Sequence, residues 1–160
     1  QGFISDETVF LKPDPSNTIT VPGNSRLPIT VGAYDHRNNS IYIHSSRGYI
    51  SRDSVKPDLA APGVDVLGPA NTSVHSGIPE NTQTFTHRTG TSAAAAITAG
   101  AVANLLNWGI VMGNYPTMSE ASIKSYLIRG ASRNPSLSYP NREFGYGTLD
   151  LLQTFLKLRE

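Results

Sequence analysis

The chain lacks cysteine altogether and carries almost no net charge. With 0 cysteines in 160 residues, it can form no disulfide, no thiolate metal site and no thiol nucleophile. Its 13 basic and 12 acidic residues give a formal charge of +1, so nothing indicates binding to nucleic acid or to an anionic membrane surface. The sequence shows no apolar run of the length expected for a membrane span. The length suits one ordinary domain.

The feature that carries the chemistry is a serine followed by a run of small residues. Gly90-Thr91-Ser92 leads directly into the stretch 93–101, which is almost entirely alanine and glycine and predicts a tightly packed helix. Ser92 would then lie in the first turn, where backbone N–H groups lack intrahelical partners and the helix dipole is positive. A nucleophilic hydroxyl and the oxyanion it generates are both stabilised there. Ser92 is therefore a candidate acyl-transfer nucleophile, and a serine N-cap is the alternative interpretation.

Four sequence blocks, in the family's order, resemble the subtilisin-like serine proteases (subtilases, peptidase S8 type). One is the Gly90-Thr91-Ser92 segment with its helix. The other three are Ile29-Thr30-Val31-Gly32-Ala33-Tyr34-Asp35, Lys56-Pro57-Asp58-Leu59-Ala60-Ala61-Pro62-Gly63-Val64-Asp65-Val66 and Phe144-Gly145-Tyr146-Gly147-Thr148-Leu149-Asp150. The end of the helix, Asn107–Val111, also resembles the clostridial branch that includes the Csp proteases. The resemblance implies the C-terminal part of an α/β, three-layer fold with a mostly parallel sheet and a buried central helix beginning at the serine.

The same resemblance implies a serine endopeptidase that cleaves peptide or protein substrates without a cofactor. Ser92 would be the nucleophile, and Gly90, Thr91 and Ser92 would form its turn and the backbone side of the oxyanion hole. Thr20 aligns loosely with the lining of the family's specificity pocket, although a loop with only a packing role fits as well. No carboxylate cluster identifies a metal site. The resemblance also implies a bacterial protein that is secreted or associated with the spore or cell envelope.

The sequence does not show the aspartate and the histidine that complete the family's catalytic triad with the serine. Subtilisin-like proteases place Asp and His before Ser along the chain, and no segment here resembles the family's Asp or His segment. The four histidines are predicted to be surface or loop residues: His36, His44, His75 and His87. Asp58 and Asp65 are predicted to be turn formers. We therefore expect the triad Asp and His, and the second oxyanion donor, to come from an upstream region absent from this chain, which alone would be inactive.

Two alternatives to this function can be weighed from the sequence. A pseudoprotease or binding module that keeps the fold without the chemistry stays open, although retention of Ser92 favours the enzyme. A hydrolase nucleophile elbow is set aside, because that fold needs a histidine downstream of the serine and none follows Ser92.

Residues 1–160 are thus expected to form one partial peptidase domain, with 1–23 as its irregular N-terminal segment. Prolines break any regular element there, and five apolar side chains are expected to need burial: Phe3, Ile4, Val9, Phe10 and Leu11. Strands are predicted at 29–34, 41–43 and in two pieces within 59–67, and a loop at 71–81. Helices are predicted at 92–112, 117–130 and 148–158.

Details of these helices give further expectations. A capping box from Thr117 to Glu120 should open the second helix, and Gly130 should end it. Leu151, Leu152 and Phe155 should be buried in the third. Gly100 in the middle of the first helix predicts a neighbour packed directly against it. Because the strands of the N-terminal half are missing, exposed core surface predicts docking of that half or self-association.

Overall fold

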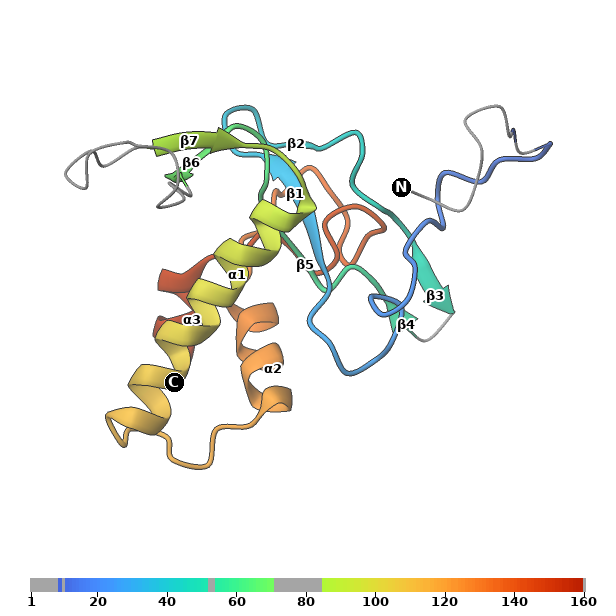
Figure 1. Cartoon of the computed structure of the whole chain (residues 1–160). Coiled ribbons are helices and arrows are strands. Elements are labelled where there is room, and N and C mark those ends of the chain that lie inside the picture. The colour runs from blue at the N-terminus through green and yellow to red at the C-terminus, as the bar shows by residue number, and fades with distance from the viewer. Residues whose placement is uncertain (1–8, 10, 52–53, 71–84, 160) are drawn as a thin grey trace.

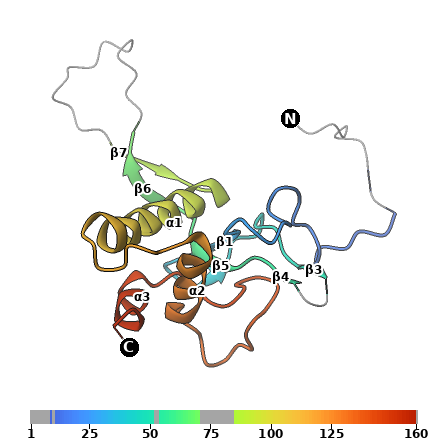
Figure 2. The same cartoon turned by 90° about the horizontal axis from the view of Figure 1, so that it is seen from below.

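The computed structural model describes residues 9, 11–51, 54–70 and 85–159, and its elements follow one another in an α/β order. The strands are β1 Val31–Asp35, β2 Ser40–Ile41, β3 Tyr49–Ser51, β4 Ser54–Val55, β5 Leu59–Pro62, β6 Val66–Pro69 and β7 Phe85–Arg88. The helices are α1 Thr91–Leu106, the π-helical turn η1 Asn107–Val111, α2 Glu120–Gly130 and α3 Leu151–Lys157. The three α-helices gather on one side of the molecule, and β3, β4 and the described residues 11–23 lie on the other (Figures 1 and 2).

The central sheet has the order β2-β1-β5. β1 and β5 are parallel, with Val31 opposite Leu59 and Ala33 opposite Ala61, whereas the short β2 pairs antiparallel to β1. Buried alanines at facing positions let α1 approach closely, because Ala33, Ala61 and Ala94 form one core cluster. The predicted strand at 41–43 is shorter than expected, since β2 ends at Ile41 and Ile43 is exposed.

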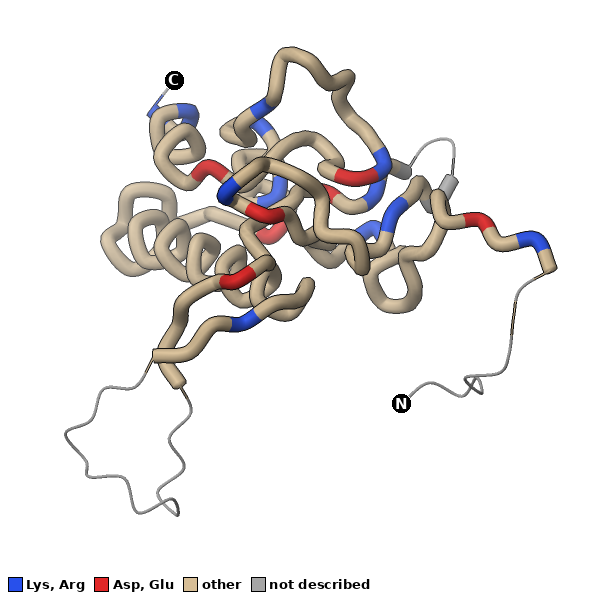
Figure 3. The backbone as a smooth tube through the Cα atoms, turned by 90° about the horizontal axis from the view of Figure 1, so that it is seen from above, with Lys and Arg blue, Asp and Glu red and all other residues tan. Residues whose placement is uncertain are grey.

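Helix α1 is only half buried. Ala94, Thr98, Ala101 and Leu105 are buried, while Ala95, Ala96, Ala99, Gly100 and Ala103 are exposed. A Cβ added to Gly100 would meet nothing within 4 Å in the described part of the chain, so the predicted neighbour is absent there. The helix also carries no charged residue, and it is uniformly tan in Figure 3. We refer to the exposed small residues Ala95, Ala96, Ala99, Gly100 and Ala103 as the open face of α1.

One helix of the described residues is long and apolar enough to cross a membrane, although the sequence analysis found no apolar run of that length. Thr91–Val111 forms 21 residues of continuous, apolar helix, which is enough to cross a bilayer. The core helix of a water-soluble domain passes the same test, so this finding is weak evidence for a membrane span. Four side chains of α1 are buried in the described structure, and 28% of the apolar window is buried in all.

Helices α2 and α3 pack against each other and complete the larger core. That core contains Leu59, Leu105, Met118, Ile123, Leu127 and Ala131. The capping box exists but begins two residues later than predicted: Ser119 is the N-cap and Ser122 is its reciprocal partner. Gly130 is the last helical residue rather than a cap beyond it, and a Cβ there would lie 2.5 Å from the backbone of Thr154 in α3.

Two further predictions about burial are wrong. Helix α3 begins after the N-cap Asp150, and Leu152 is exposed while Leu151 and Phe155 are partly buried against the core. In the N-terminal segment, Leu11 is 97% exposed and Val9 is also exposed, so these side chains are not buried within this chain. Phe3, Ile4, Phe10 and the predicted loop at 71–81 lie outside the described residues.

Candidate active site

Ser92 lies where the sequence predicted it, in the first turn of α1. Gly90 is the N-cap, with φ of 147°, and it caps without a side-chain hydrogen bond. Because Gly90 occupies that position, the alternative interpretation of Ser92 as an N-cap is wrong. Ser92 and Thr91 are exposed, and the described part of the chain supplies no hydrogen-bond acceptor for either backbone N–H group. The site therefore presents a hydroxyl beside free amides at the positive end of a helix, an arrangement suited to an oxyanion.

The turn before Ser92 is held by the end of the central sheet. Gly63 N donates to Tyr34 O at 3.0 Å, and Gly90 N donates to Gly63 O at 2.7 Å, so β1, the Pro62-Gly63 turn and the serine turn form one hydrogen-bonded chain. There is no room for a side chain at Gly63, because a Cβ would lie 2.6 Å from Ala33 Cβ and 2.9 Å from Gly90 O. Close backbone contact thus fixes where α1 begins.

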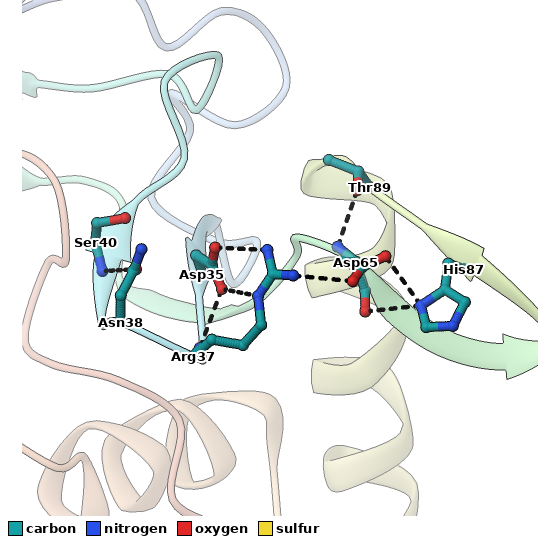
Figure 4. Close-up of polar contacts among 7 residues, drawn as sticks. All are labelled: Asp35, Arg37, Asn38, Ser40, Asp65, His87 and Thr89. Carbon is teal, nitrogen blue, oxygen red and sulfur yellow. Dashed lines mark hydrogen bonds and ion pairs between the residues drawn. The ribbon is translucent and has the colours of Figure 1, made fainter.

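A surface network of charged side chains supports the same turn (Figure 4). Asp65 has φ of 54°, and its backbone N–H donates to Thr89 Oγ1 at 2.9 Å. Its carboxylate lies 3.0 Å from Arg37 Nη1 and 2.9 Å from His87 Nδ1. Arg37 also bonds both oxygens of Asp35, and these contacts lower the pKa of the Asp35 carboxyl to about 2. The prediction of Asp65 as a turn residue agrees with this conformation.

The described histidines lie on the surface. His36, His44 and His87 are exposed, and His75 is outside the described residues. His87 bonds to Asp65, and no contact in the described structure joins it to Ser92. The described residues also contain no group of three His, Cys, Asp or Glu side chains arranged to hold a metal ion. The described part of the chain therefore places no histidine in contact with the candidate nucleophile Ser92.

A pocket opens beside the serine turn and contains Thr20. It has a volume of about 230 Å³, and we call it the Thr20 pocket. One wall is the loop that carries Thr20, Val21 and Pro22, and the opposite side includes Pro57 and Thr91. The structure thus brings Thr20 and Thr91, which are 71 residues apart in number, to one concave surface next to Ser92. Buried Ser45, which the sequence analysis did not single out, also lines this pocket, and its Oγ accepts a hydrogen bond from Ala33 N at 3.0 Å.

Asp58 is not a turn former, contrary to the sequence interpretation. Its side chain is 4% exposed and lies between two ammonium groups, Lys56 Nζ at 2.6 Å and Lys124 Nζ at 2.9 Å. Lys56 and Asp58 are two positions apart, with Pro57 between them, so that in extended backbone both side chains lie on one face. This spacing was the only feature of the sequence that indicated their contact. The third member, Lys124, lies in α2, and nothing in the sequence indicated that it would contact Asp58. We call these three residues the Lys56–Asp58–Lys124 cluster.

Comparison with known proteins gives this geometry its context. The sequence model described as the Subtilase family matches residues 10–147. The chain belongs to the subtilase family. Among curated relatives, this subtilase is 31% identical to serine protease AprX of Bacillus subtilis over 129 residues, and 32% identical to subtilisin DY of Bacillus licheniformis over 116. These matches cover 74% and 72% of the chain but only 28% and 34% of the relatives, so the subtilase chain spans about a third of their length.

Solved structures agree on the fold and on the branch. The CspB protease of Clostridium perfringens superposes with a TM-score of 0.83 at 36% identity, covering 96% of this chain and 31% of CspB. Fervidolysin of Fervidobacterium pennivorans gives a TM-score of 0.63 at 25% identity, covering 85% of this chain and 20% of fervidolysin. The predicted subtilisin-like α/β fold and the Csp-type resemblance are confirmed, and the chain belongs to a family of serine proteases.

Proposed function

We propose that this chain is the nucleophile-bearing part of a serine endopeptidase, and that Ser92 attacks the scissile carbonyl of a peptide or protein substrate. The observation that carries the proposal is the placement of Ser92: exposed, in the first turn of α1, beside backbone N–H groups without acceptors in the described structure. The Ser92 N–H would donate to the developing oxyanion, where a preorganised donor lowers the barrier most effectively. Gly90 and Thr91 hold the turn in that orientation.

The general base belongs, in this proposal, to a region of the protein that precedes this chain. A histidine from that region would take the Ser92 proton and return it to the leaving amine, and an aspartate would orient the imidazole. Two observations support this arrangement. The described histidines make no contact with Ser92, and the chain spans about a third of its curated relatives.

We further propose that the preceding region packs on the open face of α1. The residues of this face are small and uncharged, so the backbone of another segment can pack closely against them. Removal of this apolar surface from water would stabilise the assembled protein. The Thr20 pocket would then receive the substrate side chain next to the scissile bond, with Thr20 and Thr91 as polar groups in its wall. The protein is proposed to act outside the cell or at the spore or cell envelope of a bacterium, which fractionation of producing cells would test.

Labelling of Ser92 by a fluorophosphonate, followed by intact mass, tests the chemistry. The probe is applied to the isolated chain and to the intact protein, each with Ser92→Ala and with the exposed α2 serine variant Ser125→Ala as a control. We expect labelling of the intact protein and of its Ser125→Ala variant, and no labelling of the intact Ser92→Ala variant or of any form of the isolated chain. Absence of labelling in every sample would contradict the enzyme and favour the pseudoprotease, and labelling of the isolated chain would contradict a base supplied from outside it.

A further inference from the structure

The wall of the Thr20 pocket is a loop without regular structure. This pocket loop, residues 20–28, lies before β1 and contains no helix or strand. Its only internal backbone bonds, among those described, run from Asn24 N to Thr20 O at 3.1 Å and from Ser25 N to Pro22 O at 3.0 Å. Two turn bonds do not fix a nine-residue loop against the body of the protein. Its position, and with it the width of the pocket, depends on contacts with other elements.

The Lys56–Asp58–Lys124 cluster supplies those contacts. Lys56 Nζ donates to Pro28 O at 2.7 Å and to Thr30 Oγ1 at 3.1 Å. Lys124 Nζ donates to Arg26 O at 2.9 Å, also in the pocket loop. Both ammonium groups are in turn held by the carboxylate of Asp58. The cluster therefore bonds the second half of the pocket loop to α2 and to the segment directly before β5.

The first half of the loop is connected to the cluster through one hydroxyl. Thr30 Oγ1, which accepts from Lys56 Nζ, donates to Gly23 O at 2.7 Å. The backbone N–H of Thr30 donates to Asp58 Oδ2 at 2.7 Å, so the hydroxyl and the N–H of Thr30 both belong to this network. Pro57, between the two charged residues, itself lines the pocket. Cluster and pocket wall are thus continuous through direct hydrogen bonds.

Stability alone does not account for such a cluster. The side chain of Lys56 is 2% exposed, and its burial is the main cause that lowers the pKa of this ammonium group, against the opposing effect of Asp58. Apolar side chains of similar volume often stabilise a core as well as a buried ion pair does. They could not donate to the carbonyls of Arg26 and Pro28. What the charged cluster contributes, and an apolar one would not, is the position of the pocket loop.

We propose that Lys56, Asp58 and Lys124 are positioning residues that set the width of the Thr20 pocket, and so the affinity and selectivity for the substrate side chain that enters it. The proposal rests on the endopeptidase function proposed above. The three residues act through the pocket loop and Pro57 and have no part in the bond-making steps at Ser92.

The test compares Lys56→Met with the exposed-lysine control Lys12→Met in the intact protein. Peptides with a small or a large residue before the scissile bond are hydrolysed, and hydrogen exchange is followed over residues 19–31. In Lys56→Met we expect faster exchange in the pocket loop, a rise of about tenfold in KM for the preferred peptide, a smaller ratio between the two peptides, and kcat within about threefold of the wild type. Lys124→Met, whose side chain is already 21% exposed, should change the same quantities in the same direction but less, and it serves if Lys56→Met fails to fold.

Other outcomes overturn the inference. Unchanged exchange in the pocket loop means that the cluster does not hold it. A fall in kcat at unchanged KM and unchanged peptide selectivity means that the cluster has only a structural role. A wild-type protein that hydrolyses neither peptide and takes no fluorophosphonate contradicts the proposed function itself, and the exchange measurement still decides whether the cluster positions the loop.

Discussion

Gly63 shows how one residue without a side chain can fix the turn that carries the candidate nucleophile Ser92. Its backbone links β1 to the serine turn through two hydrogen bonds, and its Cα faces Ala33 at a distance that leaves no room for a methyl group. The Lys-Pro-Asp…Ala-Pro-Gly segment was identified from sequence as a family block. The reason for its glycine became visible only when Ala33, 30 positions earlier in the numbering, was placed against it.

We therefore predict that Gly63→Ala destabilises the chain and displaces the serine turn. Overpacking of this kind costs about 1–3 kcal/mol of unfolding free energy. Urea unfolding followed by circular dichroism measures the change. Gly68→Ala is the matched control, since a Cβ at Gly68 in β6 would meet nothing within 4 Å, and equal losses in the two variants would contradict the packing argument.

The second prediction for a single residue concerns Arg37 and the free energy of unfolding at acidic pH. Arg37 lowers the pKa of Asp35 from 3.8 to about 2, chiefly through its side-chain hydrogen bonds. A lowered carboxyl pKa favours the folded state above the ordinary value, and this contribution is lost as the pH falls from 3.8 through about 2. In Arg37→Gln, carboxyl ¹³C titration should show a rise of the Asp35 pKa toward 3.8. The free energy of unfolding of this variant should also depend less on pH between 3.8 and about 2. Arg88→Gln on β7 should leave the Asp35 pKa where it is.

At the scale of elements, helix ends were the least accurate part of the sequence analysis. The sequence analysis expected a capping box from Thr117 to Glu120, which have the spacing of that motif. The structure forms it two residues later, with Ser119 Oγ accepting from Ser122 N at 3.3 Å and Ser122 Oγ accepting from Ser119 N at 2.8 Å. Buried Met118, just before the cap, packs in the core beside Ile123 and so determines where the helix begins.

Ser119→Ala should accordingly weaken α2, while the predicted cap Thr117 should matter less. Loss of an N-cap hydroxyl costs about 1 kcal/mol in the free energy of unfolding. Thermal unfolding of Ser119→Ala, Thr117→Ala and the mid-helix control Ser125→Ala makes the comparison, because Ser125 is exposed on the same helix. A larger loss for Thr117→Ala than for Ser119→Ala would restore the original sequence prediction.

At the scale of the whole molecule, the open face of α1 is the main difference between expectation and structure. The resemblance implied a buried central helix, and among the described residues only one side of that helix is covered, by β1, β5 and the two core clusters. A chain that spans about a third of its curated relatives carries fewer elements than they do to pack around it. The same small residues that suit a buried helix are therefore exposed to solvent here.

Substitution of Gly100 by alanine should change the free energy of unfolding, and the sign of this change depends on what covers the open face. In the isolated chain, Gly100→Ala should raise the free energy of unfolding by about 1 kcal/mol, since alanine is the better helix former and the added methyl group contacts nothing. In the intact protein the same substitution should be destabilising, because the preceding region would pack against Gly100. Chemical unfolding of both forms measures the two signs. Stabilisation of both forms would contradict docking on the open face at this residue.

Local patterns determined much of this protein. The family, the place of Ser92 at the start of a helix, the strand pieces around Pro62-Gly63 and the existence of three helices all follow from short stretches of sequence, because turn chemistry, hydrophobic period and small-residue runs act over a few residues. Tertiary structure alone decided the Lys56–Asp58–Lys124 cluster and the wall of the Thr20 pocket. Lys124 reaches the carbonyl of Arg26 across 98 residues of chain. No local period encodes such a pairing, since it exists only after β5 and α2 have packed and brought an ammonium group, a carboxylate and a loop carbonyl within hydrogen-bonding distance.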